Sequence, residues 1–562
     1  MKLSIKLIHF ILLLVAFASY TGCKNHNKPA EKEIVKNPEE IDEQVADNLR
    51  SVLQYAEGNN GKIDDSNNLA LTNIVSAFYD NNGYHNLWSK KGNWLPIADS
   101  MIDFIEHSRY YGLYPDDYHF KKMVALRKKF REDSLAKKDV VFWTKADLLL
   151  SDAFLKTIKD LKEGRLLPDS VSIINNKKSI DSLFIKGLKK ATDENSLISI
   201  FNSTEPLNAN YQSLRETMKN FVDSMDTATY TYIAYPLKDS LRVIKKMQKR
   251  LSEAGVATNN ILLPDSLTLN NEIKQFQQAH ALKVDGKISA RLVKKLNNTD
   301  AEKFKRIAVT LDRYKRMPAL PSYYIWVNLP GYYLKVIAHD SVALESRVIV
   351  GKPETRTPLL NSSISDMVIY PQWTIPESII KKDILPALKK DPGYLQRKGF
   401  SLIDIKGDSV DPYTVNWQKY SIGIPWKVRQ GSGDDNALGI FKFNFSNPYN
   451  VYLHDTNQRY LFKNSSRALS HGCVRVQNWQ GLAYLLARND SKNLAAGQKL
   501  LYNEDSIKTW IANKNRKQIM LKSKFPLYIK YFTCEAKNGK LIFYDDIYNE
   551  DKMYAEKYFA NK

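Results

Sequence analysis

The period of the hydrophobic pattern changes partway along the chain, and this change constrains the fold most. Residues from about 49 to 235 mostly have helical spacing, most clearly at 147–161, where Leu150, Phe154, Ile158 and Leu161 share one face. From residue 323 onwards short apolar runs alternate with turn residues such as Pro330 and Gly331, which is typical of strands. A helical region followed by a strand-rich one predicts a multidomain α+β protein with a helical N-terminal scaffold domain.

The strand-rich region is predicted to form one mostly β domain over residues 301–540. Strand-like runs occupy 323–328, 332–337 and 345–351, and a second group spans 439–453. Between them the stretch 381–430 is long and polar and contains Asp391-Pro392-Gly393. A long insertion beside a core is usually functional, so we interpret 381–430 as a capping insertion and 541–562 as a C-terminal tail.

A small module is predicted between these regions, over residues 236–300. Three short apolar patterns fit three helices that share one small core, and Gly255 ends the first. His280 is interpreted as a packing residue of the second helix rather than as a ligand. The apolar positions are Leu241, Ile244, Met247 and Leu251, then Ile273 and Phe276, then Leu292, Val293 and Leu296.

The first residues have the pattern of an export signal. Lys2 and Lys6 precede an apolar run over 7–18, and small residues lead to Gly22 and Cys23. This arrangement resembles a lipobox, so 1–22 is predicted to be a lipoprotein signal peptide, Cys23 the lipidated residue and 23–48 a tether; cleavage followed by secretion is the alternative. We therefore expect a bacterial envelope protein in the periplasm, anchored to the inner or outer membrane.

The chain has three cysteines, at positions 23, 473 and 534. A single bridge between Cys473 and Cys534 is one interpretation. Because Cys534 ends an alternating run over 528–534, a small buried hydrophobe is the preferred interpretation for it. Cys473 would then be a free thiol in an oxidising compartment, which is expected of a thiol that is used.

Cys473 lies in the run Ser470-His471-Gly472-Cys473, nineteen residues after His454. A thiol attacks carbonyls as thiolate, so it needs a base and a positive setting. His454 is the better base, because a residue on a separate strand can face the thiol, whereas His471 is too close along the chain. Gly472 permits close backbone approach, so the amides of Gly472 and Cys473 can face a developing oxyanion. Either Asp455 or a backbone carbonyl could orient His454.

Other interpretations of these residues are a buried structural cysteine and a zinc site that uses both histidines and the thiol. The formal net charge of +22 fits a solvated basic surface or attraction to an anionic envelope polymer. Nucleic acid is not expected as a partner, because export argues against it and no arginine-rich run is interleaved with aromatic residues.

Residues 301–540 resemble the catalytic domain of L,D-transpeptidases, the YkuD-type fold, in which a histidine is followed by Ser/Thr-His-Gly-Cys. Together with Trp373 and Asp391-Pro392-Gly393, nearly the whole chain resembles the large YcbB-like branch of that family. The segment 273–288, with its Asp285-Gly286 turn, resembles the peptidoglycan-binding type 1 module.

The resemblance implies a reaction and a set of roles. Cys473 would attack a tetrapeptide stem of peptidoglycan and release D-alanine, with His454 as the base and the Gly472 and Cys473 amides as oxyanion donors. A second stem would then accept the acyl group through its diamino acid, and carbapenems would block the thiol. The residues expected to contact substrate are Tyr452, Trp373, Ser470, His471 and Arg475.

Several points stay open at this stage. Arg475 could face a substrate carboxylate or form a structural ion pair. Water could replace the amine acceptor, giving an L,D-carboxypeptidase or cross-link hydrolase, and a non-catalytic peptidoglycan-binding scaffold is the remaining alternative. No metal or cofactor is expected. The expected partners are stem peptides, glycan strands, the membrane and peptidoglycan synthases.

Overall fold

The computed structural model describes residues 29–166, 197–236, 240–256, 266–492 and 501–559. The predicted signal peptide, Cys23 and the first part of the predicted tether lie outside these residues. The chain divides into two compact units, of which the first holds the described residues up to Arg165 and 197–225. The second holds the rest, from Asp226 onwards with Leu166. We describe each unit by itself.

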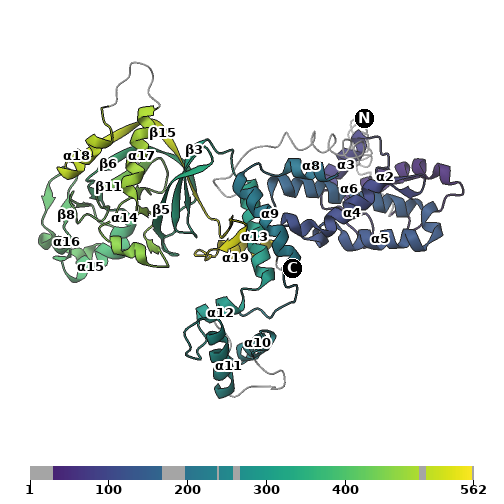
Figure 1. The fold of residues 1–562 in the computed structure, drawn as a ribbon, viewed down its shortest axis with the longest axis horizontal. Helices are drawn as coiled ribbons and strands as arrows, with labels where there is room; N and C mark the ends of the chain where they lie inside the picture. Colours follow the sequence, from purple (N-terminus) through teal and green to yellow (C-terminus); the bar gives the residue numbers. More distant parts are fainter. Residues whose placement is uncertain (1–28, 167–196, 237–239, 257–265, 493–500, 560–562) are drawn as a thin grey trace, which may run out of the picture. The chain divides into compact units, whose positions relative to one another are not determined.

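The first unit is a helical domain built around the long helix α6 (Val140–Glu163) (Figure 1). This helix begins earlier than the predicted 147–161, because the Asp139 side chain caps it by accepting from the N–H groups of Val141 and Phe142. The other helices are α2 (Ile41–Gly58), α3 (Thr72–Asn81), α4 (Pro96–Glu106), α5 (Phe120–Glu132), α8 (Leu197–Thr204) and α9 (Ala209–Ser224), with a small hairpin of β1 (Ser89–Lys90) and β2 (Asn93–Trp94) and short turns η1 (Pro38–Glu40), η2 (Ser108–Tyr111), η3 (Pro115–Tyr118) and η4 (Ser134–Lys138).

Helix α6 is buried on almost every side, and it carries buried carboxylates that tie the surrounding loops to it. Asp147 accepts hydrogen bonds from the Tyr79 hydroxyl and from the N–H groups of Leu87 and Trp88. Burial raises the pKa of Asp147 to about 6, and these donors oppose that shift. The polar contacts in this unit thus hold loops in place, and the aromatic residues around them form a packed core.

The second unit starts with a three-helix group whose apolar residues form their own core. In its Asp285-Gly286 turn both N–H groups donate to the Gln277 side chain, and Gly286 has a φ of 68°. The ring of His280 stacks on Phe276 with centroids 4.0 Å apart, which is a packing role. The side chain of Leu241 lies outside the description. The helices are α10 (Ser240–Glu253), α11 (Ser266–Ala279) and α12 (Ala290–Leu296).

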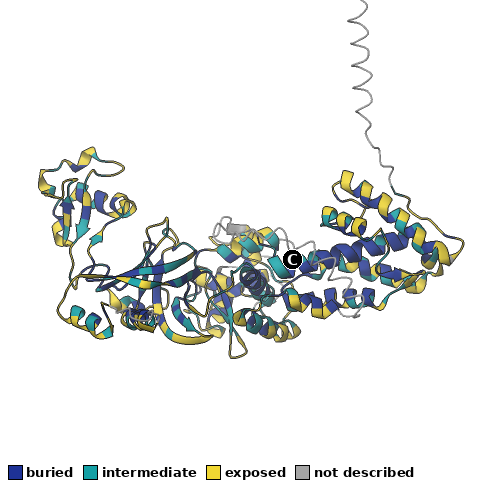
Figure 2. Cartoon of the chain, turned by 90° about the horizontal axis from the view of Figure 1, so that it is seen from above, coloured by how far each residue is buried: buried dark blue, intermediate teal, exposed yellow. Residues whose placement is uncertain are grey.

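The core of the second unit is a nine-stranded sheet in the described part of the chain, with the order β13-β5-β14-β12-β11-β6-β15-β3-β4. An additional pairing between β4 and β5 closes eight of these strands into a ring. Apolar residues from these strands and from helix α17 (Trp479–Lys492) form one buried cluster, and Figure 2 draws buried residues in dark blue. The strands are β3 (Tyr323–Asn328), β4 (Tyr333–Ala338), β5 (Ser341–Gly351), β6 (Leu360–Ile369), β11 (Phe441–Phe445), β12 (Leu453–His454), β13 (Ala468–Ser470), β14 (Val474–Val476) and β15 (Lys517–Lys530).

The predicted capping insertion is a subdomain with its own apolar core, and it begins earlier than residue 381. Its four-stranded sheet has the order β7-β10-β8-β9 and starts at Trp373, because β7 pairs with β10 at the far end of the insertion. Its elements are β7 (Trp373–Thr374), α14 (Glu377–Ile379), the π-helix η5 (Ile380–Ile384), α15 (Leu385–Lys390), α16 (Tyr394–Arg397), β8 (Phe400–Ile403), β9 (Ser409–Val410), η6 (Pro412–Thr414), η7 (Trp417–Lys419) and β10 (Lys427–Gln430).

The end of the chain folds onto the strand-rich domain, where the sequence predicted a separate tail from residue 541. Tyr548 is 1% exposed and belongs to the same apolar cluster as the sheet. Helix α13 (Asp300–Lys315) is likewise buried along much of its length, so it is more than a linker. The remaining elements are η8 (Arg459–Lys463), α17 (Trp479–Lys492), α18 (Glu504–Ala512), β16 (Cys534–Lys537), β17 (Lys540–Phe543) and α19 (Glu550–Tyr558).

Candidate active site

Neighbouring strands place the candidate catalytic side chains on one face of the sheet. Strands β12 and β14 are parallel, with His454 opposite Arg475, and the Val474 N–H donates to the Tyr452 carbonyl at 3.1 Å. Side chains alternate along strands, so His454, Arg475, Tyr452 and Cys473 project from the same face. In the sequence nineteen positions separate His454 from Cys473, and strand register brings the two pairs of residues together.

The same register adds Lys442, which sequence reasoning missed. Lys442 on β11 lies opposite His454, and its ammonium is 4.0 Å from the centre of the Tyr452 ring. No motif marks this lysine. Its only sequence signal is the alternation of Phe441, Lys442 and Phe443, which requires the pairing with β12 before it becomes informative.

The nucleophile turn is held by hydrogen bonds within the motif. Gly472 has a φ of 124°, which favours glycine. The Ser470 hydroxyl donates to the Cys473 carbonyl at 2.6 Å and accepts from the Gly472 N–H at 3.1 Å. The Gly472 amide, expected at an oxyanion, is therefore occupied here, whereas no described residue accepts from the Cys473 N–H. Ser470 is 2% exposed and shapes the turn, where we expected a substrate contact.

His471 lies in the turn between β13 and β14 and contacts the capping insertion. Its Nε2 lies 2.9 Å from Oδ2 of Asp383, which belongs to the π-helix η5 of the insertion. The motif is thus tied to the capping subdomain through a partly exposed contact between an imidazole and a carboxylate. This contact differs from the substrate contact that the sequence suggested.

His454 is 5% exposed, and its imidazole is neutral at pH 7. Burial lowers its pKa to about 3, and the positive charges of Arg475 and Lys442 add to that shift, while the backbone of Asp455 and Leu438 opposes it. A neutral imidazole can accept a proton. Among the described residues no hydrogen bond joins it to the Cys473 thiol.

Asp455 does not orient His454 through its carboxylate. That carboxylate accepts two hydrogen bonds from Arg459 and one, at 3.0 Å, from the Ile440 N–H. Of the two orienting groups that the sequence left open, the side chain is therefore engaged elsewhere. The Nδ1 atom of His454 has no hydrogen-bond partner among the described residues.

The Cys473 thiol lies in a positive setting. Burial raises its pKa, and Tyr452, Lys442 and Arg475 act in the opposite direction. Arg475 donates to Gln458 Oε1 at 3.0 Å, and in the described part of the chain it has no carboxylate within ion-pair distance. Its Nε is buried without a partner among the same residues. A structural ion pair, one of the two interpretations from the sequence, is therefore not what holds Arg475.

A pocket of about 410 Å³ opens beside this face and shares Lys442 with it. Trp373, expected to line the substrate cleft, follows Gln372 of this pocket, and its indole nitrogen is buried without a hydrogen-bond partner among the described residues. The pocket therefore has two cations, two amides and an apolar wall. It is lined by Val368, Pro371, Gln372, Lys442, Arg516 and Gln518.

Three further observations hold for the described residues of the chain. Both Cys473 and Cys534 are free thiols, so the Cys473–Cys534 bridge is not formed. No group of three or more His, Cys, Asp or Glu side chains in this part of the chain is arranged to hold a metal ion. Within the same ranges no helix is long and apolar enough to span a membrane.

Comparison with known proteins assigns a class to each unit. Residues 322–490 match the L,D-transpeptidase catalytic domain named YkuD, and residues 73–218 match a family described as a scaffold domain. The second unit therefore contains an L,D-transpeptidase catalytic domain of the YkuD family, joined to a helical scaffold domain in a multidomain α+β chain.

The chain is also similar to individual proteins. The Haemophilus influenzae protein named "Putative L,D-transpeptidase" is 37% identical over 241 residues, which is 42% of this chain and 47% of that protein. The chain thus spans about half the length of this curated relative. Among solved structures, an L,D-transpeptidase (Yku) from Stackebrandtia nassauensis is 15% identical, covering 56% of this chain and 100% of that one with a TM-score of 0.15. A cysteine-to-serine mutant of an Enterococcus faecium L,D-transpeptidase is 11% identical, covering 57% and 100%, also with a TM-score of 0.15.

Proposed function

We propose that this protein is a cysteine-dependent L,D-transpeptidase that cross-links peptidoglycan stem peptides. The observation that carries the proposal is the shared strand face of Cys473, His454 and Arg475 within a YkuD catalytic domain. A neutral buried imidazole beside a thiol among cations supplies the base, the nucleophile and the positive setting that acyl transfer needs.

In the first half-reaction Cys473 Sγ attacks the carbonyl between the diamino acid and the terminal D-alanine of a donor stem. His454 takes the thiol proton as the S–C bond forms, and the Cys473 N–H is the free backbone donor for the oxyanion. The C–N bond then breaks, His454 returns the proton to the leaving amine, and D-alanine departs. A thioester on Cys473 remains.

In the second half-reaction the side-chain amine of another stem attacks this thioester. The amine loses a proton to His454, the C–S bond breaks, and the proton returns to the Cys473 sulfur, so that the enzyme is regenerated and an amide cross-link is formed. If water attacks in place of the amine, the product is a free tripeptide stem. That hydrolytic reaction is the alternative function of the same site.

The donor stem is proposed to lie across the pocket lined by Lys442 and Arg516. Stem peptides carry carboxylates, and cations without carboxylate partners suit them. Arg475 is proposed to stabilise negative charge nearer the thiol, because its guanidinium is buried and held by neutral Gln458 and Thr456. Tyr452 and Trp373 are proposed to form the wall of the cleft beneath the capping insertion.

The remaining assignments follow from the sequence and are also proposals. The large YcbB-like branch, the peptidoglycan-binding role of the three-helix group and the lipid anchor at Cys23 together describe an envelope protein held close to its polymer. Its proposed partners are glycan strands, stem peptides, the membrane and peptidoglycan synthases, and carbapenems are the proposed covalent inhibitors.

The test is mass spectrometry of purified protein with a carbapenem and, separately, with a disaccharide tetrapeptide. We expect a covalent adduct that Cys473→Ala removes, and a cross-linked dimer with loss of D-alanine. Tripeptide without dimer would assign the hydrolytic reaction. Absence of any adduct, together with retained binding to sacculi, would contradict the enzyme and favour the scaffold.

A further inference from the structure

We propose that the C-terminal segment 545–551 positions the nucleophile turn, and that Tyr548 is the positioning residue. The inference rests on the proposed function, because it takes Cys473 as the nucleophile. The segment lies beyond residues 322–490, which match the catalytic domain family. It was interpreted from the sequence as part of a tail.

The Tyr548 hydroxyl bridges two ends of the loop 351–357. It donates to the Gly351 carbonyl at 2.8 Å and accepts from the Thr357 N–H at 3.1 Å. Tyr548 is 1% exposed and Thr357 is 2% exposed, so water cannot readily replace these bonds. The hydroxyl therefore fixes the spacing between Gly351 and Thr357.

The same loop holds the nucleophile turn. The Thr357 hydroxyl accepts from the Gly351 N–H at 2.9 Å and donates to the Gly472 carbonyl at 2.7 Å. On the other side of the turn, the Ser470 carbonyl accepts from the Thr355 hydroxyl at 3.0 Å and from the Lys352 N–H at 2.9 Å. Both carbonyls that flank His471 are thus bound to the loop that Tyr548 closes.

The loop is tightly packed around Gly351. A Cβ at Gly351 would lie 2.1 Å from the Thr355 carbonyl oxygen and 2.7 Å from the Thr357 nitrogen. The chain therefore turns back on itself around Gly351. A small shift of this loop would move Gly472 and the Cys473 N–H that follows it, and an oxyanion donor must be placed to within a fraction of an ångström.

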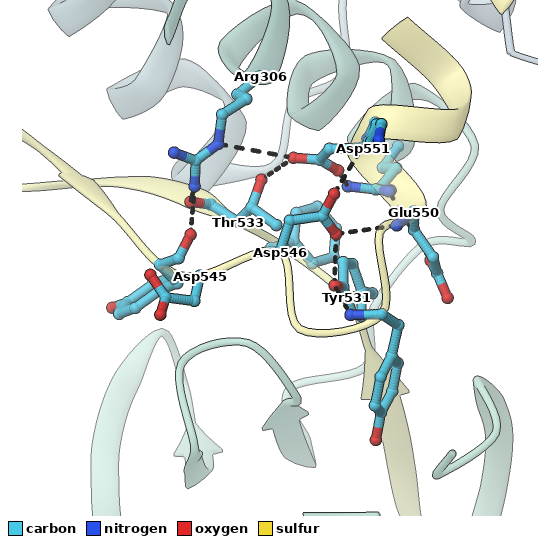
Figure 3. A network of polar contacts seen from close by, with 12 residues as sticks. Arg306, Tyr531, Thr533, Asp545, Asp546, Glu550 and Asp551 are labelled. Carbon is cyan, nitrogen blue, oxygen red and sulfur yellow. Dashed lines mark hydrogen bonds and ion pairs between the residues drawn. The ribbon is translucent and has the colours of Figure 1, made fainter. Parts of the chain in front are cut away.

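A polar network that includes Tyr531, Asp546 and Asp551 (Figure 3) holds Tyr548 in place. Its N–H donates to the Tyr531 hydroxyl at 2.9 Å, which in turn donates to Asp546 at 2.5 Å. Its ring stacks on Tyr531 with centroids 5.6 Å apart. Three residues later, Asp551 accepts from Thr533 and pairs with Arg313 of α13 at 2.5 Å. The network connects α13, the end of β15 and α19, and together these elements support Tyr548.

The first test compares Tyr548→Phe with Tyr502→Phe in the full chain. Tyr502 is a matched control, since it is buried in the same apolar cluster and donates to Asp490 at 2.5 Å, with no bond to the nucleophile turn. We expect peptide-resolved hydrogen exchange over 470–474 to become about tenfold faster in Tyr548→Phe alone, on the usual strength of two hydrogen bonds. Equal exchange in both variants would overturn the proposal.

The second readout is the rate of Cys473 acylation by a carbapenem. Tyr548→Phe should lower the maximal acylation rate about tenfold while the concentration for half-maximal rate changes less than about twofold, because positioning affects the transition state. An effect confined to the half-maximal concentration would contradict positioning. If the wild-type protein is not acylated by the carbapenem, the proposed function is contradicted. Hydrogen exchange would then still decide whether Tyr548 holds the nucleophile turn.

Two variants at Thr357 provide a test that does not depend on whether Tyr548→Phe folds correctly. Thr357→Val removes the hydroxyl that links Gly351 to Gly472, and Thr357→Ser retains it. Exchange over 470–474 should rise in Thr357→Val and stay within about twofold of wild type in Thr357→Ser. Equal exchange in the two variants would overturn the link between the loop and the turn.

Discussion

The two thiols of the catalytic domain have opposite electrostatic surroundings. Burial raises the pKa of both Cys473 and Cys534. Around Cys473 the charged neighbours are Lys442 and Arg475, which lower the thiol pKa. Around Cys534 the carboxylates Asp551 and Glu535 raise it further, and Arg306 alone opposes them. Cys473 is partly buried and Cys534 is fully buried, and the two thiols also differ in the sign of the neighbouring charge, which controls thiol reactivity.

The two regions also differ in how their charges are paired. Beside Cys534, Arg306 and Arg313 both form ion pairs with Asp551, so a carboxylate of the protein largely neutralises their charge. Beside Cys473, neither cation has a carboxylate within ion-pair distance among the described residues. Unpaired cations in a partly buried cleft have a cost for folding, and binding an anion offsets it. This difference supports the proposal that the Cys473 face is the active site.

The most direct test of this difference between the two thiols is to remove each of them in turn. Cys473→Ala should abolish acylation by a carbapenem, because the attacking sulfur is lost. Cys534→Ala should keep the acylation rate within about twofold of wild type, since that side chain only fills space. Intact-mass spectrometry after a fixed incubation measures both. An adduct that persists in Cys473→Ala would overturn the assignment.

The two histidines beside Cys473 should differ by a large factor. His454→Ala should slow acylation by a factor of about 10² or more, the usual contribution of a general base. His471→Ala should lose much less, because its imidazole pairs with Asp383 on the insertion. Stopped-flow acylation rates compare the variants, and thermal unfolding controls for misfolding. Equal decreases in the acylation rate for the two variants would contradict the assignment of His454 as the base.

Much of the fold was predictable from the sequence, and the reasons are local. The multidomain α+β class follows from hydrophobic period, and strands such as β3 and β5 follow from alternation bounded by turn residues. The packing role of His280 follows from its place on an amphipathic helix. By contrast, the start of the insertion at Trp373 depends on pairing with β10, more than fifty residues away, which no local pattern encodes.

The candidate site was predictable only in part. The motif supplied Cys473 and His454 because they are chemically distinctive residues at a recognisable spacing. Lys442 was missed, since its role depends on strand register with His454. The partners of Ser470, His471 and the Gly472 amide were also not predictable, because each depends on a hydrogen bond that forms only when the turn folds.

The pH dependence of thiol reactivity should separate the two cysteines. The Cys473 pKa lies above its usual range, so its thiolate fraction, and its alkylation rate, should rise about tenfold per pH unit between pH 6 and 8. His454 has a pKa of about 3, so it stays neutral over this range and adds no inflection near its usual value. Cys534 should stay unmodified throughout, because its side chain is fully buried.

Iodoacetamide labelling with peptide mapping measures both rates in one sample. The expected profile for Cys473 is a single rising limb in wild type and in His454→Asn. A plateau that begins below pH 7 would indicate a thiolate–imidazolium pair instead, and its loss in His454→Asn would contradict the neutral imidazole inferred here.

The smallest expected effect comes from the cation that the sequence did not reveal. Lys442→Met removes a charge that lowers the Cys473 pKa, so alkylation at pH 7 should slow by roughly three- to tenfold, equivalent to a pKa rise of about half to one unit. The side-chain volume is nearly kept, so the Tyr452 ring retains its contact. Lys442→Arg, which keeps the charge, should stay closer to wild type, and Lys540→Met, an exposed lysine on β17, controls for net charge. Because an unpaired cation is costly inside a protein, Lys442→Met should also raise the thermal midpoint or leave it unchanged. Slower alkylation with lower stability would point to packing as the cause, and would weaken the contrast between the two thiols.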